Sequence, residues 1–279
     1  MKQLVREGVV FPESPRWHDG RLWFSDVYDF SLKAVDGAGH VTTVAKMPGR
    51  PSGLGTLPDG RMLVATALDR VLYAVTPTGQ MEIISDLSER TPGLLNDMVV
   101  DARGRAYVGD NGFNPASGEP FVVGRTWLVA PGTEPRVVAE DMHLPNGCAI
   151  SEDGRTLYVA ETYAERITCF AIEEDGRLSA RRVHAQLSSR PDGLCLDAGG
   201  HLWVAMVLDG EFVRIDPSGD IVERLSSPWP FALACTFGGQ DRDQLFVTSA
   251  DTTLERLRTG CSAGRIDYLA RPVGGAGLP

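Results

Sequence analysis

The stretch NGCAISEDGRTLYVAE, from Asn146 to Glu161, decides the fold because its pattern occurs six times in the chain. A polar residue opens a short apolar segment, a polar turn ends in glycine, and an alternating apolar segment follows. The other copies are ESPRWHDGRLWFSD from residue 13, SGLGTLPDGRMLVAT from 52, NDMVVDARGRAYVGD from 96, DGLCLDAGGHLWVAM from 192 and a weaker one, FALACTFGGQDRDQLFVTSA, from 231.

The spacing of these copies predicts the architecture. Successive starts are 39, 44, 50, 46 and 39 residues apart, an average of about 44, which is the period of a propeller blade. Further alternating segments separated by turns rich in Gly, Pro and Asp follow each copy, which indicates four antiparallel strands per blade. We therefore expect an all-β, six-bladed β-propeller that occupies residues 1–279 as a single domain.

The last repeat lacks one strand, because the chain ends in Gly- and Pro-rich sequence after residue 270. The N-terminal segment QLVREGVV, residues 3–10, has the pattern to replace it, which would close the ring and cover an exposed sheet edge. Helical periodicity is nearly missing; residues 86–90 have room for one turn.

Composition limits the partners. The chain has 27 Lys and Arg against 37 Asp and Glu, a net charge of −10, and no basic run for a nucleic acid or a membrane surface. It has no apolar run of membrane-spanning length, and the N-terminus lacks the apolar core of a signal peptide, so we expect a cytoplasmic protein. The five cysteines form no C-x-x-C pair and read as small core residues.

The repeat register brings polar residues together at one end of the propeller. Ser52, Asn96, Asn146 and Asp192 each lie eight residues before the turn glycine of their repeat, and Glu13 lies seven before its own. Either the first turn is one residue shorter, or the longer Glu side chain reaches from the next position. Equivalent residues of the blades converge around the axis of a propeller. The sixth copy offers Phe231.

Two carboxylates and two amides, from Glu13, Asn96, Asn146 and Asp192, form a ligand set that suits a hard cation, with Ca²⁺ the best match. None of the five histidines opens a repeat, which disfavours zinc. Asn-Gly and Asp-Gly are also common turn dipeptides, so any one of these residues alone could mark a turn. Four polar residues in register favour a site.

Several segments resemble the regucalcin/gluconolactonase (senescence marker protein) family of six-bladed propeller lactonases. These are FPESPRW from residue 11, LNDMVVDARGRAYVGD from 95, LPNGCAIS from 144, TLYVAET from 156 and RPDGLCLDAGGHLWVA from 190. The resemblance implies a divalent metal held by Glu13, Asn146 and Asp192. It also implies that Asn96 contacts the substrate and metal-bound water.

One departure from the family pattern concerns the substrate. Sugar-lactone members often carry an Arg two residues before the Asn that matches Asn96, and this chain has Leu94 there. We therefore expect a lactone or ester less polar than a sugar lactone, unless another blade supplies a basic group. The insertion at residues 110–125 is either a loop over the mouth or surface decoration.

The resemblance and the ligand set together predict a metal-dependent lactonase that opens a cyclic ester with activated water. Asp192 is the candidate general base and Asn96 the residue that orients substrate or water. The chain has no Gly-x-Ser-x-Gly elbow, which disfavours covalent catalysis.

Three other readings stay open. The ligand set also resembles that of the squid-type diisopropylfluorophosphatase, so organophosphate hydrolysis is the main alternative. A non-catalytic metal-binding propeller is the second. Strictosidine-synthase-like propellers rank lower, since they lack this metal set. Zn²⁺, Mn²⁺ or Mg²⁺ could replace Ca²⁺ at an oxygen-rich site. The sequence names neither the substrate nor the oligomeric state.

Overall fold

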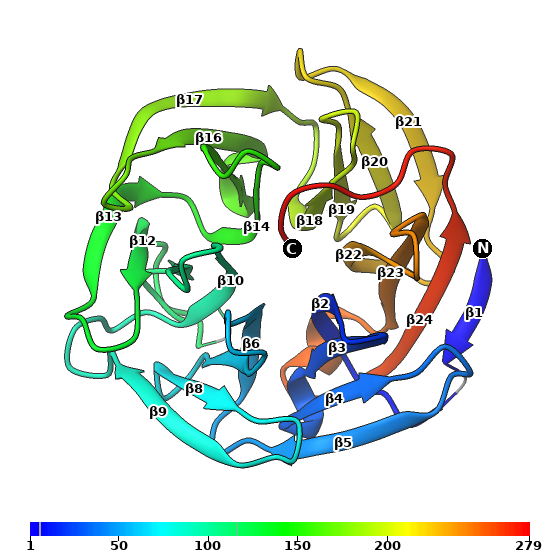
Figure 1. The fold of residues 1–279 in the computed structure, drawn as a ribbon, viewed down its shortest axis with the longest axis horizontal. Helices are drawn as coiled ribbons and strands as arrows, with labels where there is room; N and C mark the ends of the chain where they lie inside the picture. Colours follow the sequence, from blue (N-terminus) through cyan, green and yellow to red (C-terminus); the bar gives the residue numbers. More distant parts are fainter. Residues whose placement is uncertain (6, 116) are drawn as a thin grey trace.

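Six four-stranded antiparallel sheets form a ring in the computed structural model, which describes residues 1–5, 7–115 and 117–279 (Figure 1). Five sheets, blades one to five, use consecutive strands, numbered here from the axis outward: β2 (Pro12–His18), β3 (Arg21–Asp26), β4 (Ser31–Val35), β5 (Val41–Lys46); β6 (Pro51–Thr56), β7 (Met62–Thr66), β8 (Val71–Val75), β9 (Met81–Asp86); β10 (Leu95–Val100), β11 (Ala106–Asp110), β12 (Gly124–Val129), β13 (Arg136–Met142); β14 (Pro145–Ile150), β15 (Thr156–Glu161), β16 (Arg166–Ile172), β17 (Leu178–Gln186); β18 (Pro191–Leu196), β19 (Leu202–Met206), β20 (Glu211–Ile215), β21 (Ile221–Ser226). The predicted six-bladed propeller is confirmed.

The sixth blade joins the two ends of the chain. It contains β22 (Phe231–Gly238), β23 (Gln244–Asp251), β24 (Ala263–Ala270) and, on its outer edge, β1 (Lys2–Val5). Lys2 pairs with Tyr268 and Gln3 with Asp267 in antiparallel register. The predicted closure by the N-terminal segment is confirmed. The strand is shorter than expected, and Arg6, within the predicted segment, lies outside the described residues.

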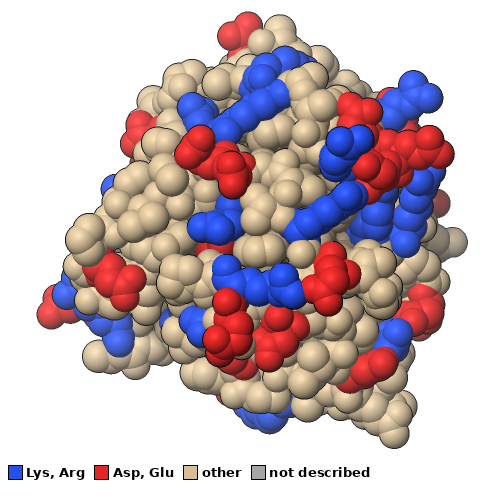
Figure 2. Space-filling model, turned by 90° about the vertical axis from the view of Figure 1, so that its left-hand side faces the viewer, with Lys and Arg blue, Asp and Glu red and all other residues tan. Residues whose placement is uncertain are grey.

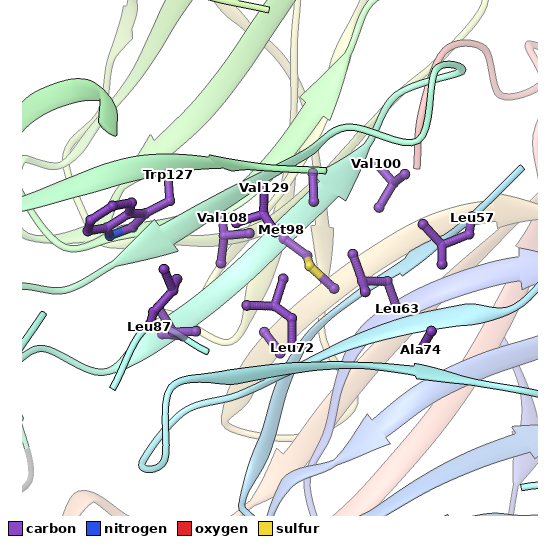
Figure 3. Close-up of a cluster of buried hydrophobic side chains, with 13 residues drawn as sticks. Leu57, Leu63, Leu72, Ala74, Leu87, Met98, Val100, Val108, Trp127 and Val129 are labelled. Atoms are coloured by element: carbon purple, nitrogen blue, oxygen red, sulfur yellow. The ribbon is translucent and has the colours of Figure 1, made fainter. Parts of the chain in front are cut away.

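The hydrophobic core lies between blades. Six clusters of buried side chains each combine residues from two neighbouring blades, one cluster for each contact around the ring. Figure 3 shows the cluster between blades two and three, where Leu63 and Leu72 of blade two meet Met98, Val108 and Trp127 of blade three. Burying such side chains stabilises each blade by packing it on its neighbours, at about 25 cal/mol per Å² of apolar surface.

The turns explain why Glu13 lies seven residues before its turn glycine, whereas the other site residues lie eight before theirs. In blade two, Gly60 has a φ of +84° and donates its N–H to the Leu57 carbonyl, a conformation that favours glycine. In blade one, His18 pairs with Arg21, so only Asp19 and Gly20 form the turn. Both have positive φ, as in a two-residue hairpin. The first turn is therefore one residue shorter, which accounts for the spacing of Glu13.

Short helical pieces accompany the strands. The structure has 3-10 turns η1 (Val27–Asp29) and η2 (Thr162–Ala164) and one helix, α1 (Leu254–Leu257), which the sequence did not predict. The expected turn near residue 90 is present, since Arg90 donates its N–H to the Leu87 carbonyl. No helix in the described part of the chain is long and apolar enough to span a bilayer.

The last residues of the chain cross one end of the ring, where Figure 1 shows the red C-terminal segment reaching toward the axis. Leu278 pairs with Ile150 of β14, and Gly275 pairs with Asp197, which follows β18. Arg242 donates to the Gly277 and Pro279 carbonyls.

On the side of the molecule in Figure 2, basic and acidic side chains lie next to one another rather than in separate fields.

Candidate metal centre and active site

Strand pairing puts the predicted site residues at equivalent positions of the inner strands. Pro12, Pro51, Leu95, Pro145 and Pro191 each pair with the last residue of the second strand of their blade, and the site residue comes next. In blade six the partner strand is longer, and Phe231 pairs with Ala250 near its end. Counted from the hairpin, the Phe237–Leu245 pair of blade six matches the Leu196–Leu202 pair of blade five. The position equivalent to Asp192 therefore belongs to Leu233, and reading Phe231 there was wrong by two residues.

Each inner strand has an irregularity at this same place. The register shifts by one residue between Pro51 and Leu54, between Leu95 and Met98, and likewise in the other blades. A β-bulge of this kind bends the strand and redirects one side chain. In β10 and β14, Asn96 and Asn146 are the only residues that are not fully buried. The bulges in these two strands thus open the Asn96 and Asn146 side chains to the end of the ring.

The glycines that follow these residues have a packing role. A Cβ on Gly147 would lie 2.3 Å from the Asp192 carbonyl oxygen, and one on Gly193 would lie 2.3 Å from the Ala234 Cβ. Neither glycine has a positive φ, and both lie inside strands. Asn146-Gly147 and Asp192-Gly193 are therefore not turn dipeptides. They let neighbouring inner strands approach closely, which brings Asn146 and Asp192 together.

A cavity of about 160 Å³ opens at this end of the ring. Its polar wall includes Glu13, Asn96, Asp97 and Asn146, and Asn96 donates to the Pro145 carbonyl at 3.1 Å. Its apolar wall is formed by Phe11, Val27, Tyr28, Ala67, Leu94 and Leu95. Asp192 does not line this cavity. Its side chain is buried, with the residue 5% exposed, and it hydrogen-bonds to the Asn146 side chain.

The electrostatics of Glu13 and Asp192 differ from those of ordinary surface carboxylates. Burial raises the pKa of Glu13 well above its usual range, and the Asp192 and Asp97 charges raise it further. Burial and the Asp97 charge also raise the pKa of Asp192, although its hydrogen bond with Asn146 opposes the shift. Negative charge is therefore concentrated here, and the Ser14 N–H and the Arg16 charge offset only part of its effect on Glu13.

Asp97 is a site residue that the sequence reading missed. It accepts a hydrogen bond from Ser14 Oγ at 2.7 Å and pairs with Arg16 at 2.9 Å, and both side chains of the ion pair are buried. Asp97 occupies the position that Gly53, Gly147 and Gly193 hold in three other blades. A carboxylate at a position otherwise taken by glycine is the signal that could have revealed it.

The donor set fits a hard divalent cation. Asp192 is close enough for its negative charge to make ionisation of Glu13 less favourable. The amide oxygens of Asn146 and Asn96 lie at the same cavity as Glu13. A bound cation would remove the repulsion, and carboxylate and amide oxygens are ligands that Ca²⁺ prefers. Among the described residues, no three His, Cys, Asp or Glu side chains form a metal-binding cluster, so such a site depends on the amides.

Ser52 occupies the equivalent position in blade two but serves the sheet. Its single Oγ–H is shared between the carbonyl oxygens of Ala65 and Leu95, both at 3.2 Å, and so links blades two and three. Two residues earlier, Arg50 lines the cavity, in the blade-two position that corresponds to Leu94 in blade three. Another blade therefore supplies a basic group to the cavity, which is the exception that the sequence prediction allowed.

The insertion at residues 110–125 lies beside the mouth and packs on blade four. The rings of Phe113 and Phe121 are 5.9 and 5.7 Å from that of Tyr163, and Phe121 also contacts His143. Asn111, at the base of the insertion, lines the cavity and accepts a weak hydrogen bond from Asn96 at 3.4 Å. Ala116 lies outside the described residues.

Buried carboxylates at the ends of second strands hold the loops around the site. Asp26 accepts hydrogen bonds from the backbone N–H groups of Val10 and Phe11 and from Lys33. Asp110 accepts from Thr91 and Trp127. Glu161 takes the same place in blade four. These residues brace the segments that lead into the inner strands, and the sequence reading assigned them no role.

Fold and site together define a six-bladed propeller with a cavity of carboxylate and amide groups at one end of its axis. The chain belongs to the SMP-30/gluconolactonase/LRE-like family, whose model matches residues 11–251.

Relatives of known name include the 6-deoxy-6-sulfogluconolactonase of Pseudomonas putida, 27% identical over 90% of this chain and 87% of the relative. Regucalcin of Danio rerio is 31% identical over 88% of this chain and 85% of its own. Among solved structures, a calcium-binding regucalcin from Agrobacterium tumefaciens superposes with a TM-score of 0.84. It is 23% identical and covers 100% of this chain and 96% of its own, which supports the fold.

Proposed function

We propose that residues 1–279 act as one domain that hydrolyses a lactone with the help of a divalent cation, Ca²⁺ being the best fit. The observation that carries the proposal is the pair of neighbouring carboxylates, partly buried Glu13 and buried Asp192, whose charges repel, beside a cavity lined by two Asn amides. The names of the lactonase relatives support the same chemistry.

Glu13, Asn146 and Asp192 would hold the cation. When bound, it supplies a Lewis acid that polarises the lactone carbonyl and stabilises negative charge on its oxygen. Asn96 lines the cavity next to Asn146, and its amide N–H groups already donate to the Pro145 carbonyl and to Asn111. Its Oδ1 would accept a hydrogen bond from the attacking water and so orient it. An Asp192 carboxylate oxygen accepts the proton of that water.

The cavity walls suit a small ring. Phe11, Leu94 and Leu95 cover one side of it and keep water away from the reacting bond, which strengthens the polar contacts on the other side. Sugar lactones and less polar lactones both remain in the substrate class that we propose, since the apolar wall faces the polar one.

The experiment measures acid release at constant pH from sugar lactones, aliphatic lactones and diisopropylfluorophosphate, after chelation and after adding back Ca²⁺, Mg²⁺, Mn²⁺ or Zn²⁺. We expect lactone opening that chelation abolishes and a divalent cation restores. Calorimetry with the cation alone should show one site, lost in Asp192→Asn and kept in Asp175→Asn, the same charge change on an exposed turn.

Three outcomes would change the proposal. Faster turnover of the organophosphate than of any lactone would favour the phosphatase alternative. Cation binding without turnover of any ester would favour a non-catalytic propeller. Lactone hydrolysis that survives complete chelation would contradict metal dependence.

A further inference from the structure

Arg50 is a cation in the cavity that the reaction described above does not use. It is partly buried and lines the same cavity as Glu13 and Asn96, but on the blade-two side. Its guanidinium forms no ion pair or hydrogen bond with any residue that the structure describes. Other sheltered guanidiniums, of Arg16, Arg166 and Arg265, each pair with a carboxylate at 2.7 to 2.9 Å.

The surroundings of Arg50 keep it unpaired. The Asp69 carboxylate packs on the backbone of Gly49, where a Cβ would lie 1.8 Å from its Oδ1, and it forms no ion pair with Arg50. Within the described part of the chain, the one aromatic contact of Arg50 is with Tyr28, whose ring centroid is 5.9 Å from the guanidinium carbon. A partly buried guanidinium with five donors and no protein acceptor must find its acceptors in water or in a ligand.

Tyr28 connects the two ends of the cavity. Burial raises the pKa of its phenol; the Arg50 charge opposes this shift and the Glu13 charge adds to it. The phenol is therefore within electrostatic reach of both the carboxylate end and the cationic end. A small ring that puts its ester near Glu13 and Asn96 would direct its far substituent past Tyr28 toward Arg50.

We propose that Arg50 selects substrates with an anionic substituent, a carboxylate or a sulfonate, remote from the ester that is opened. The inference rests on the proposed function, because it concerns the far end of the same substrate. Guanidinium binds such oxyanions with two parallel hydrogen bonds, and the apolar wall of Phe11, Leu94 and Leu95 limits competition from water.

A control exists in the chain. Arg190 precedes Asp192 by two residues, as Arg50 precedes Ser52, and it too is partly buried. Its guanidinium carbon is 5.1 Å from the centroid of the Tyr163 ring, and it does not line the cavity. Arg190→Gln therefore removes the same charge at the equivalent position of another blade.

The test compares one six-membered lactone in three forms, with a hydroxymethyl, a carboxylate or a sulfonate substituent remote from the ester. In Arg50→Gln we expect kcat/KM to fall about 10- to 100-fold for both anionic forms, mainly through KM, because a hydrogen bond to a charged group is lost. We expect a change below about threefold for the hydroxymethyl form. Arg190→Gln should leave all three unchanged, and Arg50→Lys should recover part of the loss.

Two results would overturn the inference. An equal loss on neutral and anionic lactones would place Arg50 at the reacting ester, and no loss on any would remove it from binding. If the wild type opens no lactone with any cation, the proposed function fails instead. Calorimetry with cyclohexanecarboxylate against cyclohexanol then tests Arg50 alone: carboxylate binding lost only in Arg50→Gln supports it, and equal binding to both variants contradicts it.

Discussion

Two rows of carboxylates lie side by side in this propeller, and the groups that surround them differ. Asp26 and Glu161, at the ends of second strands, are surrounded by donors; Glu161 accepts from the His143 N–H and forms a two-bond pair with Arg166. Glu13 and Asp192, at the starts of first strands, are near other negative charges.

This difference distinguishes carboxylates that stabilise the fold from carboxylates that belong to the candidate site. Hydrogen bonds and the Arg166 charge lower the pKa of Glu161 despite its burial, whereas the pKa values of Glu13 and Asp192 are raised. A fold gains nothing from concentrating charge in this way, so the second arrangement supports the proposal that an external cation binds there. Burial alone would not distinguish the two rows.

The largest effect is expected for Asp192→Asn. Removing this carboxylate should lower kcat/KM for the preferred lactone by at least about 100-fold, because both cation binding and proton transfer depend on it. The chelated protein should nevertheless be as stable as the wild type or about 1 kcal/mol more stable, since a repelled charge is removed. Urea unfolding and initial rates measure both. A destabilised variant with normal turnover would show that Asp192 stabilises the fold, as Asp26 and Glu161 do.

The opposite pattern is expected for Asp26→Asn. Lys33 is buried, with 6% of its side chain exposed, and would keep only Asp29 as a charged partner. We expect the free energy of unfolding to fall by about 3 kcal/mol, as for other broken buried pairs. Turnover per folded molecule should change far less than in Asp192→Asn. Unchanged stability with lost turnover would show that Asp26 is not a brace.

The repeat made much of this fold predictable. Turn glycines at a fixed distance from a polar strand start are local signals, so the number of blades and the equivalence of Asn96, Asn146 and Asp192 follow from the chain alone. Blade six has no such marker at its strand start, because Leu233 carries no polar group, and the register was misplaced by two residues there.

Other features depend on contacts between blades, which the repeat does not encode. Gly147 is required because the Asp192 backbone approaches it closely. In the sequence, however, Asn146-Gly147 looks like a turn dipeptide. Arg50 becomes a cavity residue only when blade two is placed beside blade one. The antiparallel pairing of Leu278 with Ile150 likewise corresponds to no sequence pattern in either segment.

A smaller effect is expected for Glu161→Gln, and its pH dependence tests the lowered pKa. Near neutral pH the variant should be less stable by about 2 kcal/mol, because hydrogen bonds to a charged group are weakened. The folded pKa lies below the ordinary value of 4.5, so this contribution is complete above about pH 4.5 and is lost as the pH falls through the folded pKa. The stability difference should therefore shrink in acid. A difference that grows in acid would contradict the lowered pKa.

The smallest effect is expected at Ser52, which shares its strand position with the carboxylates but carries no charge. Ser52→Ala removes one hydroxyl donor that two carbonyls share at 3.2 Å, so the free energy of unfolding should fall by less than about 1 kcal/mol. Lactone turnover should stay within about threefold of the wild type. If Ser52→Ala instead lost as much turnover as Asp192→Asn, position around the axis, rather than uncompensated charge, would define the active residues.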